Sequence, residues 1–377
     1  MEKRGMRESR RAKLRRPGEN GVAESGEDRH SRKAGSPCHR TMTESAGMRN
    51  GGEAYIGRIH SGGIGMKILF FGSGVIGSVL AARLGSSGHD ITVLARGERL
   101  RRIREGGIVV RDGIGGETLA IRPRLVERLG GDDFYDLAVV PVRADHLDAI
   151  LPVLAANRAI RDILIMVNNP KGYGGIVEAL GRERFFLGFP GMGGGLSDNT
   201  VTYTLANRLI QPTTLGETDG SITPRLRRAA ATLRGAGFPV AVEGNMEAWQ
   251  KTHVCWILPL AAALYMAGTS PASLAGRSDI LRLMLRSIRE CFAALHAIGV
   301  PVTPSKLRVF ELMPGRLMLK ALSFGMARAD MEFLAALHVR NAPGEMRLLA
   351  DGLMELVRGA GVKAPALEAI LAHIPAK

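Results

Sequence analysis

A glycine-rich turn carries the strongest chemical signal in this sequence of 377 residues. An apolar segment before it, Lys67–Phe71, is predicted to be a buried strand, and an apolar helical pattern follows directly. In the G-x-G-x-x-G spacing, one glycine permits a sharp turn, one lets a pyrophosphate approach the backbone, and one lets helix and strand pack closely. The helix N-terminus adds free N–H groups and a positive dipole end. The pattern predicts a dinucleotide site. Its expected contacts are Gly72, Ser73, Gly74, Val75, Ile76 and Gly77.

The end of the next predicted strand, Ile91–Ala95, indicates which dinucleotide is bound. A site that prefers NAD usually has Asp or Glu here for the ribose 2′-hydroxyl, whereas this chain has Arg96. A guanidinium suits a 2′-phosphate through charge-assisted, often bidentate hydrogen bonds. We therefore expect NADPH as the cofactor. The alternative is that Arg96 is one more solvated arginine in an arginine-rich chain.

Further polar candidates follow the other strands of the predicted sheet. Continuous apolar runs at Asp136–Val142 and Ile163–Val167, separated by helical segments, are typical of buried parallel strands. Ligands bind beyond the carboxyl ends of such strands. The residues expected beside the cofactor are Arg143, Asn168, Asn169 and the segment Gly188–Gly195.

A change of period divides the chain into two expected domains. Before Asn245 we expect a charged helix (Glu98–Glu105), a hairpin (Gly107–Arg111 and Glu117–Ile121), an antiparallel edge (Val201–Leu205 and Leu209–Leu215), a helix (Pro224–Gly235) and a closing strand (Pro239–Val242). After it we expect helices at Met246–Leu264, Asp279–Ile298, Lys306–Glu311, Ala321–Leu337, Gly344–Gly359 and Ala366–His373. The fold class is thus an α/β Rossmann domain with a doubly wound sheet over residues 66–244, an all-α domain over residues 245–377, and a cleft between them for a small substrate.

Composition narrows the classes of partner. The formal net charge is +15, but aromatic residues make up only 5% and no basic run is interleaved with stacking rings, so no nucleic acid is expected. Three scattered cysteines predict neither a metal site nor a disulfide framework and suit a reducing cytoplasm. The most apolar run, Val254–Ala267, is too short to cross a membrane. Residues 1–65 are expected to be a disordered leader, or an over-extended start, since Met66 directly precedes the first strand.

Lys251 is the candidate for chemistry in the helical part. It is the only lysine between Lys171 and Lys306 and lies in an apolar helix that follows the last predicted strand. That position is expected to face the nicotinamide. The alternative is a surface lysine on the polar side of an amphipathic helix.

From Met66 onward the sequence resembles the ketopantoate reductase family (2-dehydropantoate 2-reductases). The resemblance lies in KILFFGSGVIG, in Glu-x-x-Trp-x-Lys at the head of an apolar helix with a proline, and in Gly344–Arg347 before Gly359-x-Gly361-x-x-x-Pro365. It implies a cytoplasmic, NADPH-dependent enzyme of pantothenate biosynthesis, with a helical domain like the C-terminal domain of 6-phosphogluconate dehydrogenase. It also implies residue roles: Lys251 catalytic, Glu345 and Asn169 (or Asn168) at the substrate or carboxamide, and Arg96 and Arg143 at the cofactor.

The implied chemistry is consistent with these residue types. Reduction of a 2-oxo acid turns the carbonyl oxygen into an alkoxide, which needs a cationic proton donor. Lys251 would supply both charge and proton. Glu345 would accept from a substrate hydroxyl and pair with Lys251.

Two departures from the family bear on the substrate. Cys255, one helical turn after Lys251 and expected at the substrate, replaces an asparagine of the family, and Phe333 falls where the family has a serine. We expect reduction of a 2-oxo acid, which is ketopantoate if the resemblance holds fully. The alternatives are another 2-oxo acid, a carbonyl or an imine, or a non-catalytic NADPH-binding sensor. His253 is expected to be a satisfied core or interface residue, and His338 is expected to have no partner at metal-ligand spacing. A homodimer through the apolar helices is compatible with the pattern.

Overall fold

The computed structural model describes residues 65–169 and 172–376, which belong to one compact unit of the chain. The prediction of a disordered leader over residues 1–65 falls, Gly65 apart, outside the described residues.

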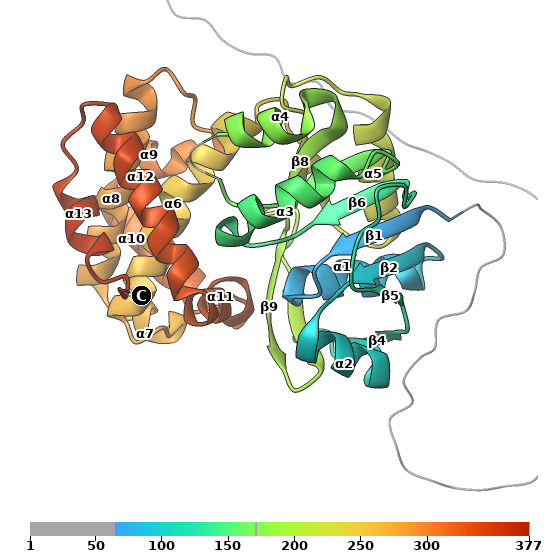
Figure 1. Cartoon of the computed structure of the whole chain (residues 1–377). Coiled ribbons are helices and arrows are strands. Elements are labelled where there is room, and N and C mark those ends of the chain that lie inside the picture. The colour runs from blue at the N-terminus through green and yellow to red at the C-terminus, as the bar shows by residue number, and fades with distance from the viewer. Residues whose placement is uncertain (1–64, 170–171, 377) are drawn as a thin grey trace, which may run out of the picture. The chain divides into compact units, whose positions relative to one another are not determined.

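A mixed sheet of eight strands forms the centre of the N-terminal region (Figure 1). In spatial order they are β12 (Val240–Val242), β11 (Thr213–Gly216), β8 (Phe185–Phe189), β7 (Asp162–Ile165), β6 (Leu137–Val140), β1 (Lys67–Phe71), β2 (Asp90–Leu94) and β5 (Arg124–Val126). The six strands from β8 to β5 run parallel, β11 is antiparallel to β8, and β12 is parallel to β11. The parallel part has the strand order of a Rossmann fold, which confirms the predicted class.

Both faces of this sheet are buried because its strands alternate apolar residues between two cores. On β1, Ile68 and Phe70 face one core, and Leu69 and Phe71 face the other. The first core is covered by α1 (Val75–Ser86), α2 (Gly97–Gly106) and α5 (Pro224–Gly235). The second is covered by α3 (Ala144–Ala156) and α4 (Gly174–Leu180). The sheet is therefore doubly wound, as predicted.

A second, four-stranded sheet packs against α1. Its spatial order is β4 (Thr118–Ile121), β3 (Ile108–Asp112), β10 (Thr200–Leu205) and β9 (Met192–Ser197). The antiparallel β3–β4 pair confirms the predicted hairpin. The predicted antiparallel edge is wrong, because β10 joins this sheet and β11 joins the large one. Between them the Asn207 side chain accepts hydrogen bonds from the N–H groups of Leu209 and Ile210, which turns the chain and leaves Leu209 exposed.

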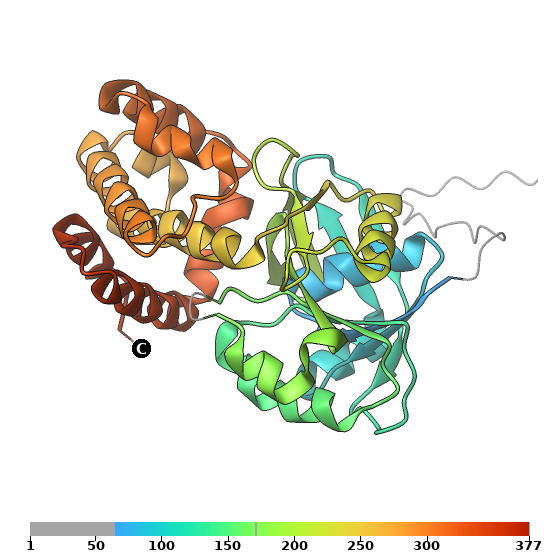
Figure 2. The same ribbon diagram turned by 90° about the horizontal axis from the view of Figure 1, so that it is seen from above.

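Helices gathered on one side of the sheets share a third core (Figure 2). They are α6 (Met246–Met266), α7 (Pro271–Ala275), α8 (Ser278–Ala297), α9 (Val309–Leu312), α10 (Gly315–Met326), α11 (Leu337–Asn341), α12 (Pro343–Gly359) and α13 (Pro365–Leu371). The prediction of one helix over Ala321–Leu337 is wrong. α10 ends at Met326, and the Asp330 carbonyl, accepting from Phe333 and Leu334, starts a new π-helical turn, η3 (Glu332–Ala336).

Candidate active site

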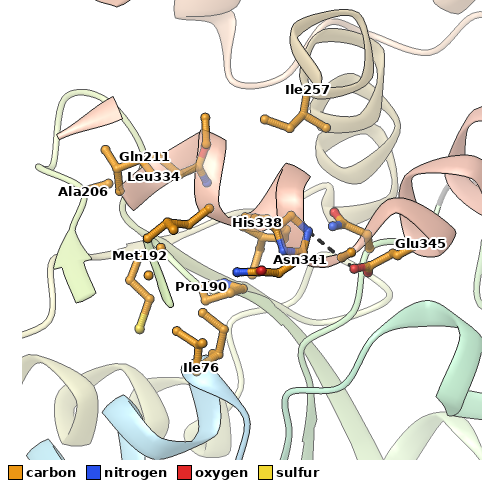
Figure 3. A pocket seen from close by; sticks show the side chains of 18 of the residues that line it. Ile76, Pro190, Met192, Ala206, Gln211, Ile257, Leu334, His338, Asn341 and Glu345 are labelled. Carbon is orange, nitrogen blue, oxygen red and sulfur yellow. Dashed lines mark ion pairs between the residues drawn. The ribbon is translucent and has the colours of Figure 1, made fainter. Parts of the chain in front are cut away.

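A cavity of about 390 Å³ lies at the carboxyl ends of β1, β6 and β7, the predicted place for a ligand in this fold. Side chains reach it from α1 (Ile76), β9 (Met192), α6 (Ile257), η3 (Leu334) and α12 (Glu345), as Figure 3 shows. The cavity therefore brings the glycine-rich turn and the helical region together around one space.

The glycine-rich turn has the geometry that a pyrophosphate requires. Gly72 has φ +109°, which favours glycine, and a Cβ at Gly77 would lie 2.4 Å from the Gly72 carbonyl oxygen. A Cβ at Gly74 would meet no protein atom within 4 Å, so this side of the turn is open. Gly74 is also the N-cap of α1 and makes no side-chain cap, so the first N–H groups of the helix remain for a ligand. Gly74, Val75 and Ile76 line the cavity, and these residues fit a dinucleotide.

Two arginines flank this turn outside the cavity lining. Arg96 follows β2 and is exposed, with its Nε donating to the Glu127 carbonyl at 3.3 Å. Arg99 supports the turn: its Nε donates to the Ser73 carbonyl at 3.0 Å and its Nη2 to Ser78 Oγ at 3.1 Å. Ser73 is itself buried, and its contact with a cofactor stays a prediction. The exposed Arg96 is the group available to a 2′-phosphate.

At the helical end of the cavity, His338 and Glu345 form a pair. His338 Nε2 lies 3.4 Å from Glu345 Oε2 (dashed line in Figure 3). Glu345 is only 4% exposed, and burial raises the pKa of its carboxyl to about 7. The Ala144 backbone N–H and the Arg143 guanidinium oppose this shift without cancelling it. The carboxyl therefore exchanges its proton near neutral pH, where a general acid is most useful.

His338 lines the cavity, and 44% of its side-chain surface is accessible. Desolvation by the surrounding protein lowers the pKa of this imidazole, and the Arg143 guanidinium lowers it further. The ring is consequently neutral at pH 7, with one nitrogen a donor and the other an acceptor.

One face of α6 forms the apolar wall of the cavity. His253, Trp256, Ile257 and Leu260 lie on it. The His253 ring stacks on Trp249, with centroids 5.1 Å apart and planes 5° apart. Its Nδ1 is buried without a hydrogen-bond partner, and burial lowers its pKa to about 3, with His338 adding to the shift. His253 is thus a neutral part of the wall, and the prediction that its hydrogen bonds are satisfied is wrong.

The opposite face of α6 carries Lys251 and Cys255. Lys251 Nζ pairs with Glu247 Oε1 at 2.5 Å, its side chain is 16% exposed, and it is not among the residues that line the cavity. Two residues of helix turn the chain by about 200°, so a lysine two positions before His253 points away from the wall that His253 forms. The structure therefore does not bring Lys251 to the cavity, and its catalytic role stays a prediction.

The prediction that Cys255 contacts substrate is contradicted. Cys255 is 0% exposed in the core of the helical region, and its thiol contacts that of Cys291. Phe333 also lies elsewhere: a Cβ added to Gly113 would come 2.6 Å from its ring, so Phe333 packs on the turn of the β3–β4 hairpin. Leu334 and Ala335 face the cavity instead.

The two predicted asparagines have different positions. Asn168 lines the cavity, whereas Asn169 Nδ2 donates to the Gly172 carbonyl at 2.5 Å and is not among the lining residues. Arg143 lines the cavity near both members of the His338–Glu345 pair. Sequence reasoning missed His338 and Asn341 as lining residues. Nothing in the spacing could have indicated them, because α11 ends at Asn341 and α12 is a separate helix.

Residues 65–169 and 172–376 contain neither a cluster of metal ligands nor a membrane-spanning helix. In these segments no three or more His, Cys, Asp or Glu residues come together as they would around a metal ion. None of the helices in these segments is long and apolar enough to cross a bilayer.

Comparison with known families identifies the N-terminal region. Residues 68–220 match the family described as ketopantoate reductase PanE/ApbA. An uncharacterized oxidoreductase of Bacillus subtilis, YkpB, is 24% identical over 246 residues, which are 64% of this chain and 78% of that protein.

Solved structures establish the fold over most of the chain. A 2-dehydropantoate 2-reductase from Geobacter metallireducens GS-15 is similar with a TM-score of 0.67 and 17% identity, over 81% of this chain and 98% of that one. A D-mandelate dehydrogenase in complex with NADH and anilino(oxo)acetate is similar with a TM-score of 0.65 and 15% identity, over 82% of this chain and 97% of that one.

Proposed function

We propose, from the premise that this chain belongs to the ketopantoate reductase PanE/ApbA family of oxidoreductases, that it reduces a 2-oxo acid with an apolar side chain and uses NADPH. The observation that carries the proposal is a single cavity with two unlike ends. One end is the open glycine-rich turn, and the other is a buried carboxyl paired with an imidazole.

The glycine-rich turn and the residues after β6 and β7 would hold the cofactor. The N–H groups at the start of α1 suit the pyrophosphate, Arg96 suits the 2′-phosphate, and Asn168 is the polar side chain available to the carboxamide. The bound cofactor would supply the hydride. NADPH rather than NADH is supported by the exposed guanidinium and by the absence of a carboxylate at position 96.

The lining supports a substrate with an apolar substituent. Met192, Trp256, Ile257, Leu260 and Leu334 face the space between the two ends. Apolar walls stabilise an apolar substituent and leave a substrate hydroxyl with few partners. Ketopantoate carries such a hydroxyl, and Glu345 and Asn341 are polar groups that could accept or donate to it. Ketopantoate, and with it a place in pantothenate biosynthesis, therefore stays the second candidate.

A substrate panel with the full chain tests this proposal. NADPH oxidation is followed with phenylglyoxylate, 2-oxoisovalerate, ketopantoate and a cyclic imine, and NADPH binding is measured separately by fluorescence. Faster turnover of the apolar 2-oxo acids supports the proposal, and faster turnover of ketopantoate supports the second candidate. NADPH binding without turnover of any of them overturns both in favour of a sensor. We propose the cytoplasm as its compartment, because Cys255 and Cys291 are free.

A further inference from the structure

We infer that His338 donates the proton that the substrate oxygen takes up, and that Glu345 in turn supplies a proton to His338. Arg143 binds the substrate carboxylate in this inference. This inference rests on the proposed function and gives its reaction a proton donor other than Lys251. The three residues come from the turn after β6, from α11 and from α12, and all three line the cavity.

The orientation of the imidazole is the first argument. His338 Nε2 is the nitrogen directed at Glu345 Oε2, so Nδ1 is the nitrogen left for another partner (Figure 3). Glu345 Oε2 is buried and has no hydrogen-bond partner in the structure, so the 3.4 Å contact is not itself a hydrogen bond. A protonated carboxyl that rotated toward Nε2 would donate to it, and the neutral ring would then carry its hydrogen on Nδ1. This arrangement follows the general rule for a catalytic imidazole, whose second nitrogen is oriented by a carboxyl group.

The charge around the pair is the second argument. Arg143 is near enough to influence both pKa values, and its own partners, Asp145 at 3.3 Å and His146 at 3.1 Å, leave its side chain 43% exposed. A guanidinium at the edge of an apolar cavity is suited to bind a carboxylate through two parallel hydrogen bonds. A 2-oxo acid held there by its carboxylate has its adjacent carbonyl close to the anchoring group, within the same cavity as His338.

The protons and electrons of the step balance. The hydride adds to the carbonyl carbon, and the π electrons of the carbonyl move to its oxygen. That oxygen takes the hydrogen from His338 Nδ1, while Nε2 takes the proton from the Glu345 carboxyl. The ring stays neutral, Glu345 becomes a carboxylate, and solvent reprotonates it before the next turnover. The product is the 2-hydroxy acid.

The groups that face this pair come from every neighbouring element. They are Glu345 from α12, Arg143 from the turn after β6, Asp145 from the first turn of α3, and His253 from α6. Burial lowers the pKa of His253 to about 3, so this ring is neutral near pH 7. The group that titrates near neutral pH is Glu345, so the rate of reduction should fall above about pH 7 as the carboxyl loses its proton.

The alternative donor, Lys251, lacks this access. Its ammonium is engaged by Glu247 on the face of α6 that turns away from the cavity wall.

Three variants and a matched control test the inference. His338→Gln removes the proton donor, and Arg143→Met removes the group that binds the substrate carboxylate. Glu345→Gln removes the carboxyl group that titrates near pH 7. His296→Gln breaks a comparable pair, His296–Glu311 at 2.7 Å, which lies outside the cavity. Besides turnover, the readouts are the Kd of oxamate (a 2-oxo acid isostere that is not reduced) and the pH titration of the His338 imidazole by NMR, assigned from the signal lost in His338→Gln.

We expect His338→Gln to lower kcat by about 10²- to 10⁴-fold with KM changed only a few-fold, as for loss of a general acid. Arg143→Met should raise the Kd of oxamate at least about tenfold. Glu345→Gln should remove the decline of rate above about pH 7 and the corresponding step in the His338 titration. His296→Gln should change none of these values.

The inference is overturned if His338→Gln keeps kcat within about fivefold of the unmodified chain, or if Lys251→Met lowers kcat more than His338→Gln does. It is also overturned if oxamate binds equally well to Arg143→Met. If no substrate of the panel is turned over, the proposed function fails. Oxamate affinity and the NMR titration still decide whether Arg143 binds a carboxylate and whether Glu345 supplies a proton to His338.

Discussion

The two ends of the cavity are built in different ways. One end is a run of six consecutive residues, Gly72 to Gly77, whose proposed contact with a phosphate depends on backbone N–H groups and on three glycines without side chains. The opposite end takes Arg143, His338 and Glu345 from three separate segments and acts through side chains. A site that uses local backbone geometry can be recognised from consecutive residues. A site that uses buried side chains can be recognised only once the packing of the whole region is known.

A second histidine–glutamate pair makes the same point. His296 and Glu311 lie closer together than His338 and Glu345, at 2.7 Å against 3.4 Å. However, Glu311 keeps 22% of its side chain exposed, while Glu345 keeps 4%. Water therefore reaches the His296–Glu311 pair, whereas protein atoms surround the Glu345 carboxyl. A short distance between the two side chains alone does not exclude water from a carboxyl group. Burial of the carboxyl is what separates the two pairs.

Two glycine variants of the turn Gly72 to Gly77 are expected to have the largest effects on stability and NADPH binding. They test the end of the cavity that this turn forms. In Gly77→Ala the new Cβ would lie 2.4 Å from the Gly72 carbonyl oxygen, so we expect a loss of about 2–4 kcal/mol in unfolding free energy together with loss of NADPH binding. Gly74→Ala meets no protein atom within 4 Å and should change stability by no more than about 0.5 kcal/mol, while weakening NADPH binding at least about tenfold. Urea unfolding and fluorescence titration measure both. Equal stability of the two variants would contradict the packing role of Gly77.

Glu345→Gln tests how strongly burial affects the carboxyl group at the helical end of the cavity. The pKa of Glu345 is about 7 in the fold against an ordinary value of 4.5, so the protonated carboxyl stabilises the fold. That contribution is complete below pH 4.5 and is lost as the pH rises through about 7. The unmodified chain should therefore lose up to about 3 kcal/mol between these pH values through this group, and Glu345→Gln should not. Unfolding at several pH values checks this, with Glu311→Gln as the control that keeps the decline. The same decline in Glu345→Gln would place its cause elsewhere.

Arg96→Ser tests the choice of nucleotide with a smaller expected effect. Removal of one exposed guanidinium should reduce the preference for NADPH over NADH at least about tenfold, because a charge-assisted hydrogen bond to a phosphate is worth about 1.5–3 kcal/mol. The Kd values of both nucleotides measure it. Arg104→Ser on the same helix is the matched control, since Arg104 is also exposed and lies 3.5 Å from Glu127. An unchanged ratio in Arg96→Ser would remove the argument for NADPH.

The surface pair should give the smallest effect. Double-mutant analysis of His296→Gln and Glu311→Gln should yield a coupling of no more than about 1 kcal/mol, as for other exposed ion pairs, and no change in turnover. A coupling energy as large as the Glu345 effect would mean that burial does not distinguish the two pairs.

Much of the fold was predictable because its signals are local. The strand β1, the turn after it and helix α5 follow from apolar runs, glycine spacing and a proline at the helix start, and the structure places them as expected. The break between α10 and η3 was not predicted, because the apolar period continues across the polar turn that interrupts the helix. Local patterns therefore identified elements better than their ends.

The candidate site was predictable only in part, and helix α6 shows why. Helical spacing correctly put Lys251 and Cys255 on one face and His253 on the other. It could not say which face meets the cavity. The structure buries Cys255 against Cys291 of α8 and turns His253 to the cavity, so the choice depends on where α8 packs.

The sequence by itself determined a glycine-rich turn between a strand and a helix and the class of fold, since glycine spacing and apolar period constrain the backbone directly. Only the tertiary structure decided that His338 and Glu345 meet beside Arg143, and that the Glu345 carboxyl is buried enough to hold a proton near neutral pH. The physical reason is that desolvation depends on all the atoms around a group, and those atoms come from helices and turns far apart in the chain.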